Sequence, residues 1–302
     1  MAWYVAAPVA PDLSRDLVTA WTVRTEGRHR LVPDGCVDVL WIDNGTVWVC
    51  GPETSAWSFR LPPGTQAVGV RFRPGRASAV FKIAAHELRD RRVALEDVLG
   101  SRAHRLLAEQ VGYAADEAAR LRVMEDHVRR WVAEAPVADA VPAAVVRMLT
   151  RDIGTSITAL ADAVGLGERQ LHRRCLTAFG YGAATLRRIL RLQGFLELAR
   201  TAGDVTGLAT LAAAAGYTDQ PHLSRDCRAI AGISPRALVA EARAGRLTGG
   251  PYDQVSRRIS SARSASRRPA SVSRMPRPTR WISFAPVSAS SRARWWLTAG
   301  WE

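Results

Sequence analysis

The sequence predicts an α+β chain in which a β-rich first half is followed by an all-helical region. Short Val- and Trp-rich runs separated by turn residues precede residue 83, and helical three- and four-residue apolar spacing begins at Glu87. Glycines recur from Pro142 onward as helix stops. A chain of 302 residues can form two domains with separate cores. We expect domains at residues 1–135 and 136–246, followed by a tail at residues 247–302.

The first half contains three strand candidates, at residues 36–42, 46–51 and 67–74. Each run is short and rich in Val, Trp and Phe, the composition that strands favour. Asn44 and Gly45 separate the first two runs, and this pair accepts the positive φ angles of a type I′ hairpin turn. We expect a cupin-like domain or a small barrel, with two amphipathic helices that close it or pair with another copy. These helices lie within residues 94–111 and 115–135.

The formal charge of +14 suggests a nucleic-acid partner, but the charge is unevenly distributed. Residues 1–149 carry 19 basic and 18 acidic side chains, and residues 150–246 carry 13 and 8. The tail carries 10 basic and 2 acidic side chains, which is more than half of the excess. DNA binding must therefore be argued from the pattern of the middle region.

The Arg-, Ser- and Pro-rich tail lacks periodic apolar positions, so we expect it to be disordered. A functional basic tail that adds non-specific DNA affinity and an out-of-frame reading of a GC-rich gene are the alternatives.

No apolar run approaches the roughly 18 residues that a membrane span needs. The start is interrupted by Pro8 and Pro11 and has no basic segment typical of a signal peptide. We expect a cytoplasmic protein without a membrane partner.

One segment of the helical region occurs twice, at residues 160–181 and 211–233. The spacing between matching residues is 51 in the first part and 52 in the second, so the second copy has one extra residue near its turn. Repeated helical units of this size indicate two copies of one module. The matching pairs are Leu160 and Leu211, Ala161 and Ala212, Gly165 and Gly216, Leu171 and Leu223, Arg173 and Arg225, Cys175 and Cys227, and Gly180 and Gly232.

Each copy contains the parts of a helix-turn-helix: a short Ala-rich helix, a glycine-centred turn and a second helix. In the second copy we expect Thr218 to cap the second helix and Asp219 to interact favourably with the helix dipole. Apolar residues four apart face inward in both second helices, which leaves polar residues outside. The expected inward residues are Leu171, Cys175, Leu223 and Cys227.

The outward residues of the two second helices suit base edges in the major groove of DNA. Arg can bond guanine, Gln can bond adenine, and His can donate to a purine N7 or to a phosphate. A solvated face is the simpler interpretation of one such helix, whereas duplication of scaffold, turn and face favours DNA reading. The predicted DNA-binding residues are Arg169, His172 and Arg173 in the first copy, and Gln220, His222 and Arg225 in the second.

An amphipathic helix at residues 183–200 joins the two copies. Its apolar residues Leu186, Ile189, Leu190 and Phe195 can dock onto both modules. This would place the two reading helices about 34 Å apart, which is one turn of DNA. The candidate phosphate contacts are Arg187, Arg188, Arg191 and Arg228.

Residues 142–246 resemble the two-module DNA-binding domain of the AraC/XylS family of transcription regulators. The stretch GYTDQPHLSRDCRAIAGISP, at residues 216–235, is similar to that family's signature in its second module. Departures are Cys227 and Ile230 in place of larger aromatics, and Pro221 in the first helical turn, where proline is tolerated. The resemblance implies a transcription regulator with double-stranded DNA and RNA polymerase as partners.

The first half more weakly resembles a domain that precedes such modules in some family members. The segments that carry this resemblance include LVPDGCVDVLWID and LPPGTQAVGVRFRPG. It implies a β-rich sensing or dimerising half, so we expect a small-molecule effector and a homodimer as further partners. The candidate effector-pocket residues are Trp41, Trp48, Arg71 and Phe72, with core packing as the alternative for the aromatics.

A cupin-like or thiol-based enzyme domain fused to a DNA-binding module is the alternative function. The strand region contains one histidine before residue 86, His29, whereas a metal site in a barrel needs several ligands. The four cysteines form no CxxC pair, and packed thiols are favoured over a ligand or redox pair at Cys36 and Cys50. Asp34 and Asp38 also disfavour a thiolate at Cys36. We therefore expect no catalytic residue, no metal and no cofactor.

Overall fold

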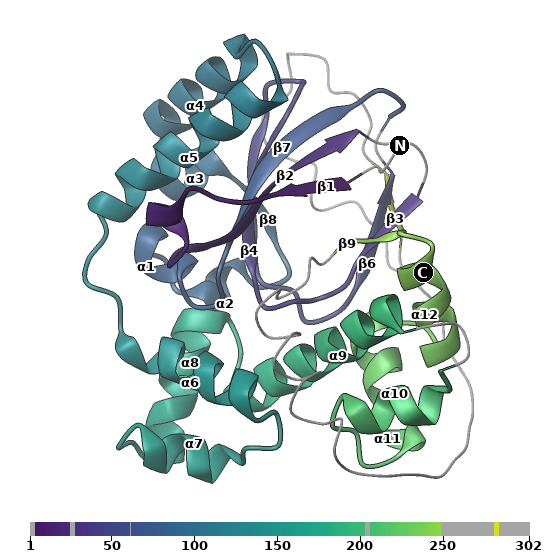
Figure 1. Ribbon diagram of the computed structural model, residues 1–302. Coiled ribbons are helices and arrows are strands. Elements are labelled where there is room, and N and C mark those ends of the chain that lie inside the picture. The colour runs from purple at the N-terminus through teal and green to yellow at the C-terminus, as the bar shows by residue number, and fades with distance from the viewer. Residues whose placement is uncertain (1–3, 25–27, 61, 203–205, 249–280, 284–302) are drawn as a thin grey trace.

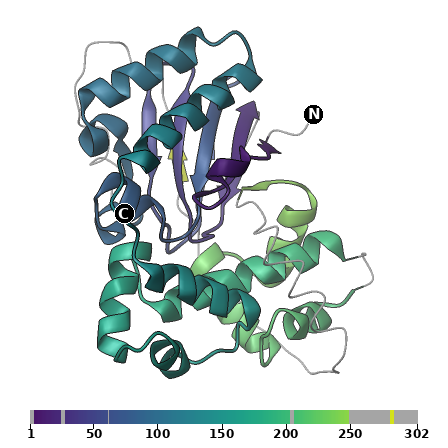
Figure 2. The same ribbon diagram turned by 60° about the vertical axis from the view of Figure 1, so that its left-hand side comes forward.

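The computed structural model describes residues 4–24, 28–60, 62–202, 206–248 and 281–283. Two facing sheets and their covering helices form one half of the molecule, and a cluster of helices forms the other (Figure 1). A view from another side shows the same division, with the cluster of helices below the sheets (Figure 2). This architecture confirms the predicted α+β class.

The main sheet is antiparallel throughout. Its strand order is β1 (Tyr4–Ala7), β2 (Leu17–Arg24), β7 (Gln66–Phe72), β4 (Val37–Ile42), β5 (Val47–Cys50) and β8 (Arg92–Ala94). A short 3-10 turn, η1 (Pro11–Leu13), joins the first two strands. The predicted hairpin is confirmed, because β4 pairs with β5 and Gly45 has a φ of 83° at the turn.

The second sheet has the order β10 (Trp281–Ser283), β6 (Trp57–Arg60), β3 (Arg28–Leu31) and β9 (Leu247–Thr248). The strands β9 and β10 belong to the segment that the sequence predicts to be disordered. These two strands have backbone hydrogen-bonding partners on β3 and β6, and the disorder of the tail stays a prediction. The remainder of residues 249–302 lies outside the described residues.

The two faces of the main sheet have different partners. One face carries α3 (Leu95–Leu99), α4 (Ser101–Tyr113) and α5 (Glu117–Ala133), with α1 (Ala77–Phe81) and α2 (Ala85–Leu88) at its end. Val39, Trp41 and Phe72 point to this face and form its core with Phe81 and Trp131. Because successive residues of a strand point to opposite sides, the alternate residues face the second sheet.

The helical region contains α6 (Ala140–Arg151), α7 (Ile157–Ala163), α8 (Glu168–Phe179), α9 (Ala183–Thr201), α10 (Leu208–Ala214), α11 (Gln220–Asp226), the π-turn η2 (Cys227–Ala231) and α12 (Pro235–Arg243). Helix α9 runs through the middle of this cluster (Figure 1). Its apolar positions Leu186, Ile189, Leu190 and Phe195 are almost fully buried, as predicted. No helix of the described residues is long and apolar enough to cross a membrane.

One apolar core crosses from the sheets into the helical region. Val32 and Cys36, on the loop before β4, are buried in the same cluster as Leu186 of α9. Gln193 of α9 donates a hydrogen bond to the carbonyl oxygen of Pro33 at 2.8 Å. The two halves are therefore packed against each other, and the division of the chain into domains at residues 135 and 136 stays a prediction.

The sheet half contains a buried histidine that predicts a pH-dependent stability. Burial, and secondarily the charge of Arg130, lowers the pKa of His127 to about 4. In the unfolded chain the same group titrates near its ordinary 6.5, so the unfolded state binds more protons between these values. The free energy of unfolding should therefore decrease as the pH falls from about 6.5 to 4.

His127→Gln should reduce that decrease, because glutamine does not titrate and can still donate to Gln110, which accepts from His127 at 2.9 Å. Urea unfolding at a series of pH values measures the effect. If the free energy of unfolding of the variant depends on pH as steeply as that of the wild type, groups other than His127 cause the dependence.

Candidate nucleic-acid interface and effector pocket

The first module consists of α7, a glycine turn and α8. Ser156 caps α7 by accepting a hydrogen bond from the Ala159 amide at 3.1 Å. Gly165 has a φ of 67°, a conformation that glycine adopts without cost, and it lets the chain turn sharply before α8. Leu171 and Cys175 are fully buried, which confirms the predicted inward face.

The second module consists of α10, a turn at Gly216 and α11. The expected cap at Thr218 is wrong: Asp219 caps α11, and its carboxylate accepts from the His222 amide at 2.6 Å. Thr218 lies one residue before the capping position, and its hydroxyl instead contacts the His222 ring at 3.2 Å. Pro221 lies in the first turn of α11, where no intrahelical N–H bond is lost.

The predicted reading residues differ in their exposure. Arg169, His172 and Arg173 of α8 are exposed, as is Arg225 of α11. Gln220 and His222 are half-buried. The outward face of α8 is therefore more exposed to solvent than the outward face of α11. Whether these six residues read bases stays a prediction.

His222 is held by a local network. Its ring contacts Arg191 at 3.0 Å and packs edge-on against Tyr217, with 5.2 Å between ring centres. Burial, followed by the charge of Arg191, lowers the pKa of His222. A neutral ring in this setting positions the start of α11 against α9.

The candidate phosphate contacts occupy four different environments. Arg188 is exposed and forms an ion pair with the buried Asp226 at 2.8 Å. Arg187 donates to the carbonyl oxygen of Thr155 at 2.9 Å, and Arg228 is half-buried. The expectation for Arg191 is wrong, because its side chain is buried and packs against Tyr217.

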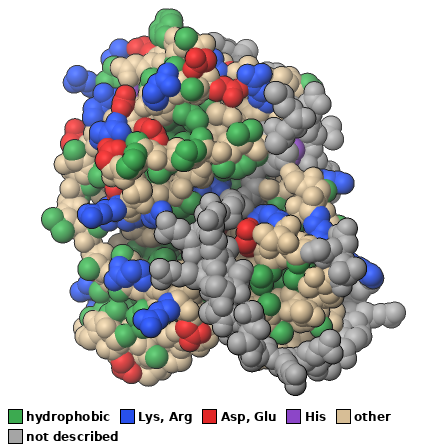
Figure 3. Space-filling view, in the orientation of Figure 1, with side chains coloured by type: hydrophobic (Ala, Val, Ile, Leu, Met, Phe, Trp, Pro, Cys, Tyr) green, Lys and Arg blue, Asp and Glu red, His purple; other side chains and the backbone are tan. Residues whose placement is uncertain are grey.

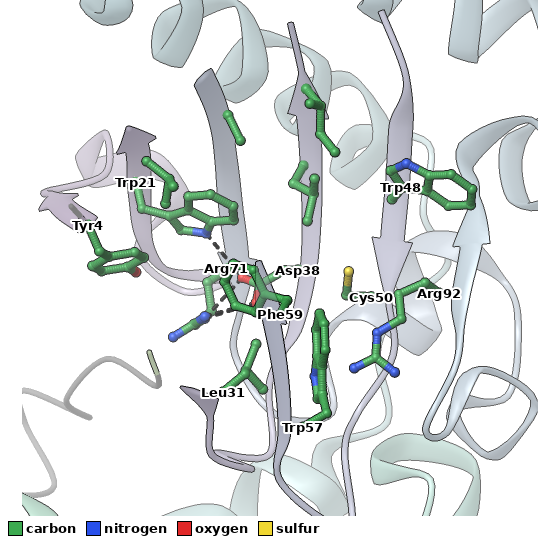
Figure 4. Close-up of a pocket in the computed structure, with 14 residues that line it drawn as sticks. Tyr4, Trp21, Leu31, Asp38, Trp48, Cys50, Trp57, Phe59, Arg71 and Arg92 are labelled. Carbon is green, nitrogen blue, oxygen red and sulfur yellow. Dashed lines mark hydrogen bonds and ion pairs between the residues drawn. The ribbon is translucent and has the colours of Figure 1, made fainter. Parts of the chain in front are cut away.

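A cavity lies between the two sheets of the first half (Figure 4). Its volume is about 80 Å³, and its walls are mainly aromatic and aliphatic. Its lining residues come from β1 to β8 and include Tyr4, Trp21, Leu40, Trp48, Trp57, Phe59, Arg71 and Arg92. Such a site suits an apolar molecule that is oriented by a few polar groups.

The charged end of the cavity is organised around Arg71. Its guanidinium contacts Asp38 at 2.9 Å and Asp34 at 3.0 Å, and Trp21 donates to Asp38 at 3.2 Å. Burial opposes the charge of Arg71, but the two carboxylates outweigh burial and raise its pKa well above its usual value. For Asp34 the balance is reversed: burial raises the pKa of this carboxyl group, and the opposing charge of Arg71 does not outweigh burial.

The structure brings together half of the predicted effector-pocket residues. Trp48 and Arg71 line the cavity, whereas Trp41 and Phe72 are buried on the opposite face of the sheet, against the helices. The four residues are divided in this way because neighbouring strand positions alternate between faces, and whether any of them contacts an effector stays a prediction. Sequence reasoning also missed Tyr4, Trp21, Asp38, Trp57, Phe59 and Arg92; the signal for Asp38 was a charge within an apolar strand run.

All four cysteines are buried as free thiols. Burial raises the pKa of Cys50 to about 12 and that of Cys175 to about 11. This burial confirms the packed thiols that the sequence favours.

The native chain should therefore react slowly with a thiol-specific reagent at pH 8, because thiolates are scarce and access is blocked. All four thiols should react after unfolding in urea. Rapid labelling of one thiol in the native chain, located by mass spectrometry, would contradict the buried arrangement.

Two family models match the chain. A helix-turn-helix domain matches residues 160–241, and a domain of unknown function, DUF6597, matches residues 6–94. No curated protein matches the chain. Among solved structures, ToxT from Vibrio cholerae is 10% identical, with a TM-score of 0.41, over 73% of this chain and 97% of that chain. Wild-type ToxT with bound unsaturated fatty acid is 11% identical, with a TM-score of 0.42, over 78% and 97%.

The duplicated modules, their connecting helix and the matching domain define a DNA-binding protein of the helix-turn-helix class. Within this class the domain is of the AraC type. The chain thus joins a β-rich domain that matches DUF6597 to a helix-turn-helix domain of the AraC type.

Proposed function

We propose that this chain is a transcription regulator of the AraC/XylS family and that it binds a specific two-part DNA site by inserting α8 and α11 into successive major grooves. The observation that carries the proposal is the pair of modules fixed to one helix, α9, with exposed arginines at matching positions, Arg173 and Arg225. The 19 residues of α9 span about 28 Å, which is close to one turn of DNA. RNA polymerase, recruited or blocked at the promoter, is the proposed partner, and the proposed location is the cytoplasm.

We further propose that a small, largely apolar effector enters the cavity between the sheets. The bound fatty acid belongs to the ToxT structure, whereas the walls of this chain's own cavity indicate the chemistry of its effector. Arg92 lies over the Trp57 ring at 3.8 Å and pairs with Glu53, so a charged and an aromatic group adjoin the apolar lining. A molecule with an aromatic or aliphatic body and one polar group fits this chemistry.

A physical connection between cavity and DNA-binding modules supports effector control. Arg71 lines the cavity and also contacts Asp34, on the loop that packs against α9. In this loop, a β-carbon at Gly35 would lie 3.2 Å from the Leu186 side chain, so the contact with α9 is close. An effector that moves Arg71 would change this contact and, with it, the orientation of the modules. A homodimer through the first half remains part of the proposal.

The DNA site can be tested with the full chain, since the core of the modules includes residues of the sheet half. Selection of bound DNA from a random library should enrich two short blocks about one helical turn apart. Arg173→Ala and Arg225→Ala should each weaken binding to the selected site by about 1–3 kcal/mol and relax preference at a few base pairs.

Arg105→Ala, at an exposed position of α4 in the sheet half, is the matched control and should leave affinity unchanged. Equal losses on all DNA sequences would identify Arg173 and Arg225 as phosphate contacts only. Failure to enrich any sequence would overturn the proposed function.

The cavity can be tested with a fluorescent apolar probe. Anilinonaphthalene sulfonate should gain fluorescence on binding the native chain, and Leu40→Trp should reduce this gain because the larger side chain fills the cavity. Val5→Trp, on the exposed part of β1, is the control and should retain the signal. Equal fluorescence of both variants would place the probe elsewhere.

A further inference from the structure

A second cleft lies between the sheet half and the first DNA-binding module. It has a volume of about 520 Å³ and separates α1 and the residues after it from the side of α8. Figure 3 shows a hollow between the two halves, with Lys and Arg side chains on both sides. Its lining includes Ser78, Lys82, Gln170, Arg173, Arg174 and Thr177.

The cleft carries excess positive charge. Three of its lining residues are cations, Lys82, Arg173 and Arg174, and the acidic residue among them is Asp139. Asp139 pairs with Arg174 at 2.9 Å and also caps α6. Within the described part of the chain, Lys82 and Arg173 have no ion pair or hydrogen bond to compensate their charge.

Lys82 has an unusual position in the fold. It ends α1 with a φ of 56°, in the left-handed region that favours glycine at helix ends. It is also the only lysine of the chain, where all other basic residues apart from histidine are arginines. Its side chain is exposed at the edge of the cleft.

When DNA is bound, the placement of α8 determines which part of the DNA lies next to this cleft. A helix with its side chains is about 10–12 Å wide and the major groove is about 12 Å wide, so a sugar-phosphate backbone lies along each side of an inserted helix. With Arg169 and Arg173 toward the bases, the side of α8 that carries Gln170, Arg174 and Thr177 faces one backbone. Lys82 lies across the cleft from that side.

We propose that one backbone of the bound DNA lies along this cleft and that Lys82 contacts a phosphodiester there. The sheet half thus forms part of the DNA interface, and a movement of that half alters DNA affinity directly. This inference rests on the proposed insertion of α8, but it assigns a contact to a residue outside both helix-turn-helix modules.

Two substitutions of the full chain separate this role from a structural one. Lys82→Gly removes the charge and relieves the left-handed backbone, so its melting temperature should equal or exceed that of the wild type. Its affinity for the selected DNA should nevertheless fall, and the slope of log affinity against log salt should decrease by about 0.9, the value for one phosphate contact. Lys82→Arg retains the charge and should retain the slope.

The two variants are compared with the wild type between 50 and 200 mM salt, where the difference in affinity should shrink about 3-fold. An unchanged slope for Lys82→Gly would overturn the contact, and tighter binding would show that α1 obstructs the DNA. If the wild type selects no DNA sequence, the proposed function fails instead. This result is distinct from an unchanged Lys82→Gly slope on a selected site.

The source of the phosphate is tested through the lysine itself. Reductive methylation with isotope-labelled formaldehyde marks the amine of Lys82 and the N-terminal amine, and NMR follows both. The Lys82 signal should shift on addition of the selected duplex and remain in place with inorganic phosphate at the same phosphate concentration. An equal shift with inorganic phosphate would show a free-anion site and overturn the backbone contact.

Discussion

The arrangement of both halves depends on the burial of one guanidinium between two carboxylates. Arg71 is 2% exposed, and a charge taken so far out of water is stable only if it is paired closely. Asp38 pairs with it from the neighbouring strand, and Asp34 pairs with it from the loop that leads into that strand. Loss of one partner from a buried pair of this kind typically costs about 3–5 kcal/mol, so the loop is held firmly against the sheet.

That loop is also where the sheets meet the DNA-binding region. Its residues Val32 and Cys36 complete the apolar core around α9. The carbonyl oxygen of Pro33 in this loop accepts a hydrogen bond from the side-chain amide of Gln193. The same ion cluster therefore forms the polar end of the cavity and fixes the surface on which α9 rests. A ligand at the cavity and the orientation of the two modules share this one group of contacts.

The two modules were predictable in detail because their signal is local. Leu171 with Cys175, and Leu223 with Cys227, are four residues apart, and helical periodicity alone places them on one side. The turn glycines were equally readable from the repeat. The cap of α11 was not, because Thr218 and Asp219 are adjacent and both residue types can cap a helix. Backbone geometry decided for Asp219.

The sheet half was predictable only at the level of its strands and hairpin. Trp41 and Trp48 look alike in sequence, yet one is packed under helices and the other lines the cavity. The face that a strand residue occupies depends on which layer packs on which side, and that is not encoded in a single strand. The burial of Arg191 likewise follows from the position of Tyr217, on a segment 26 residues further along the chain.

The sequence by itself determined the class of the protein, the duplicated modules and the inward residues of their helices, because these depend on spacing within one element. Tertiary structure alone decided which arginines are free, which aromatics form a cavity and where the two halves meet. These properties depend on contacts between segments far apart in the chain, such as Arg30 with Glu241 and Lys82 across the cleft from α8. A one-dimensional pattern cannot specify such contacts, because the packing of all layers together determines them.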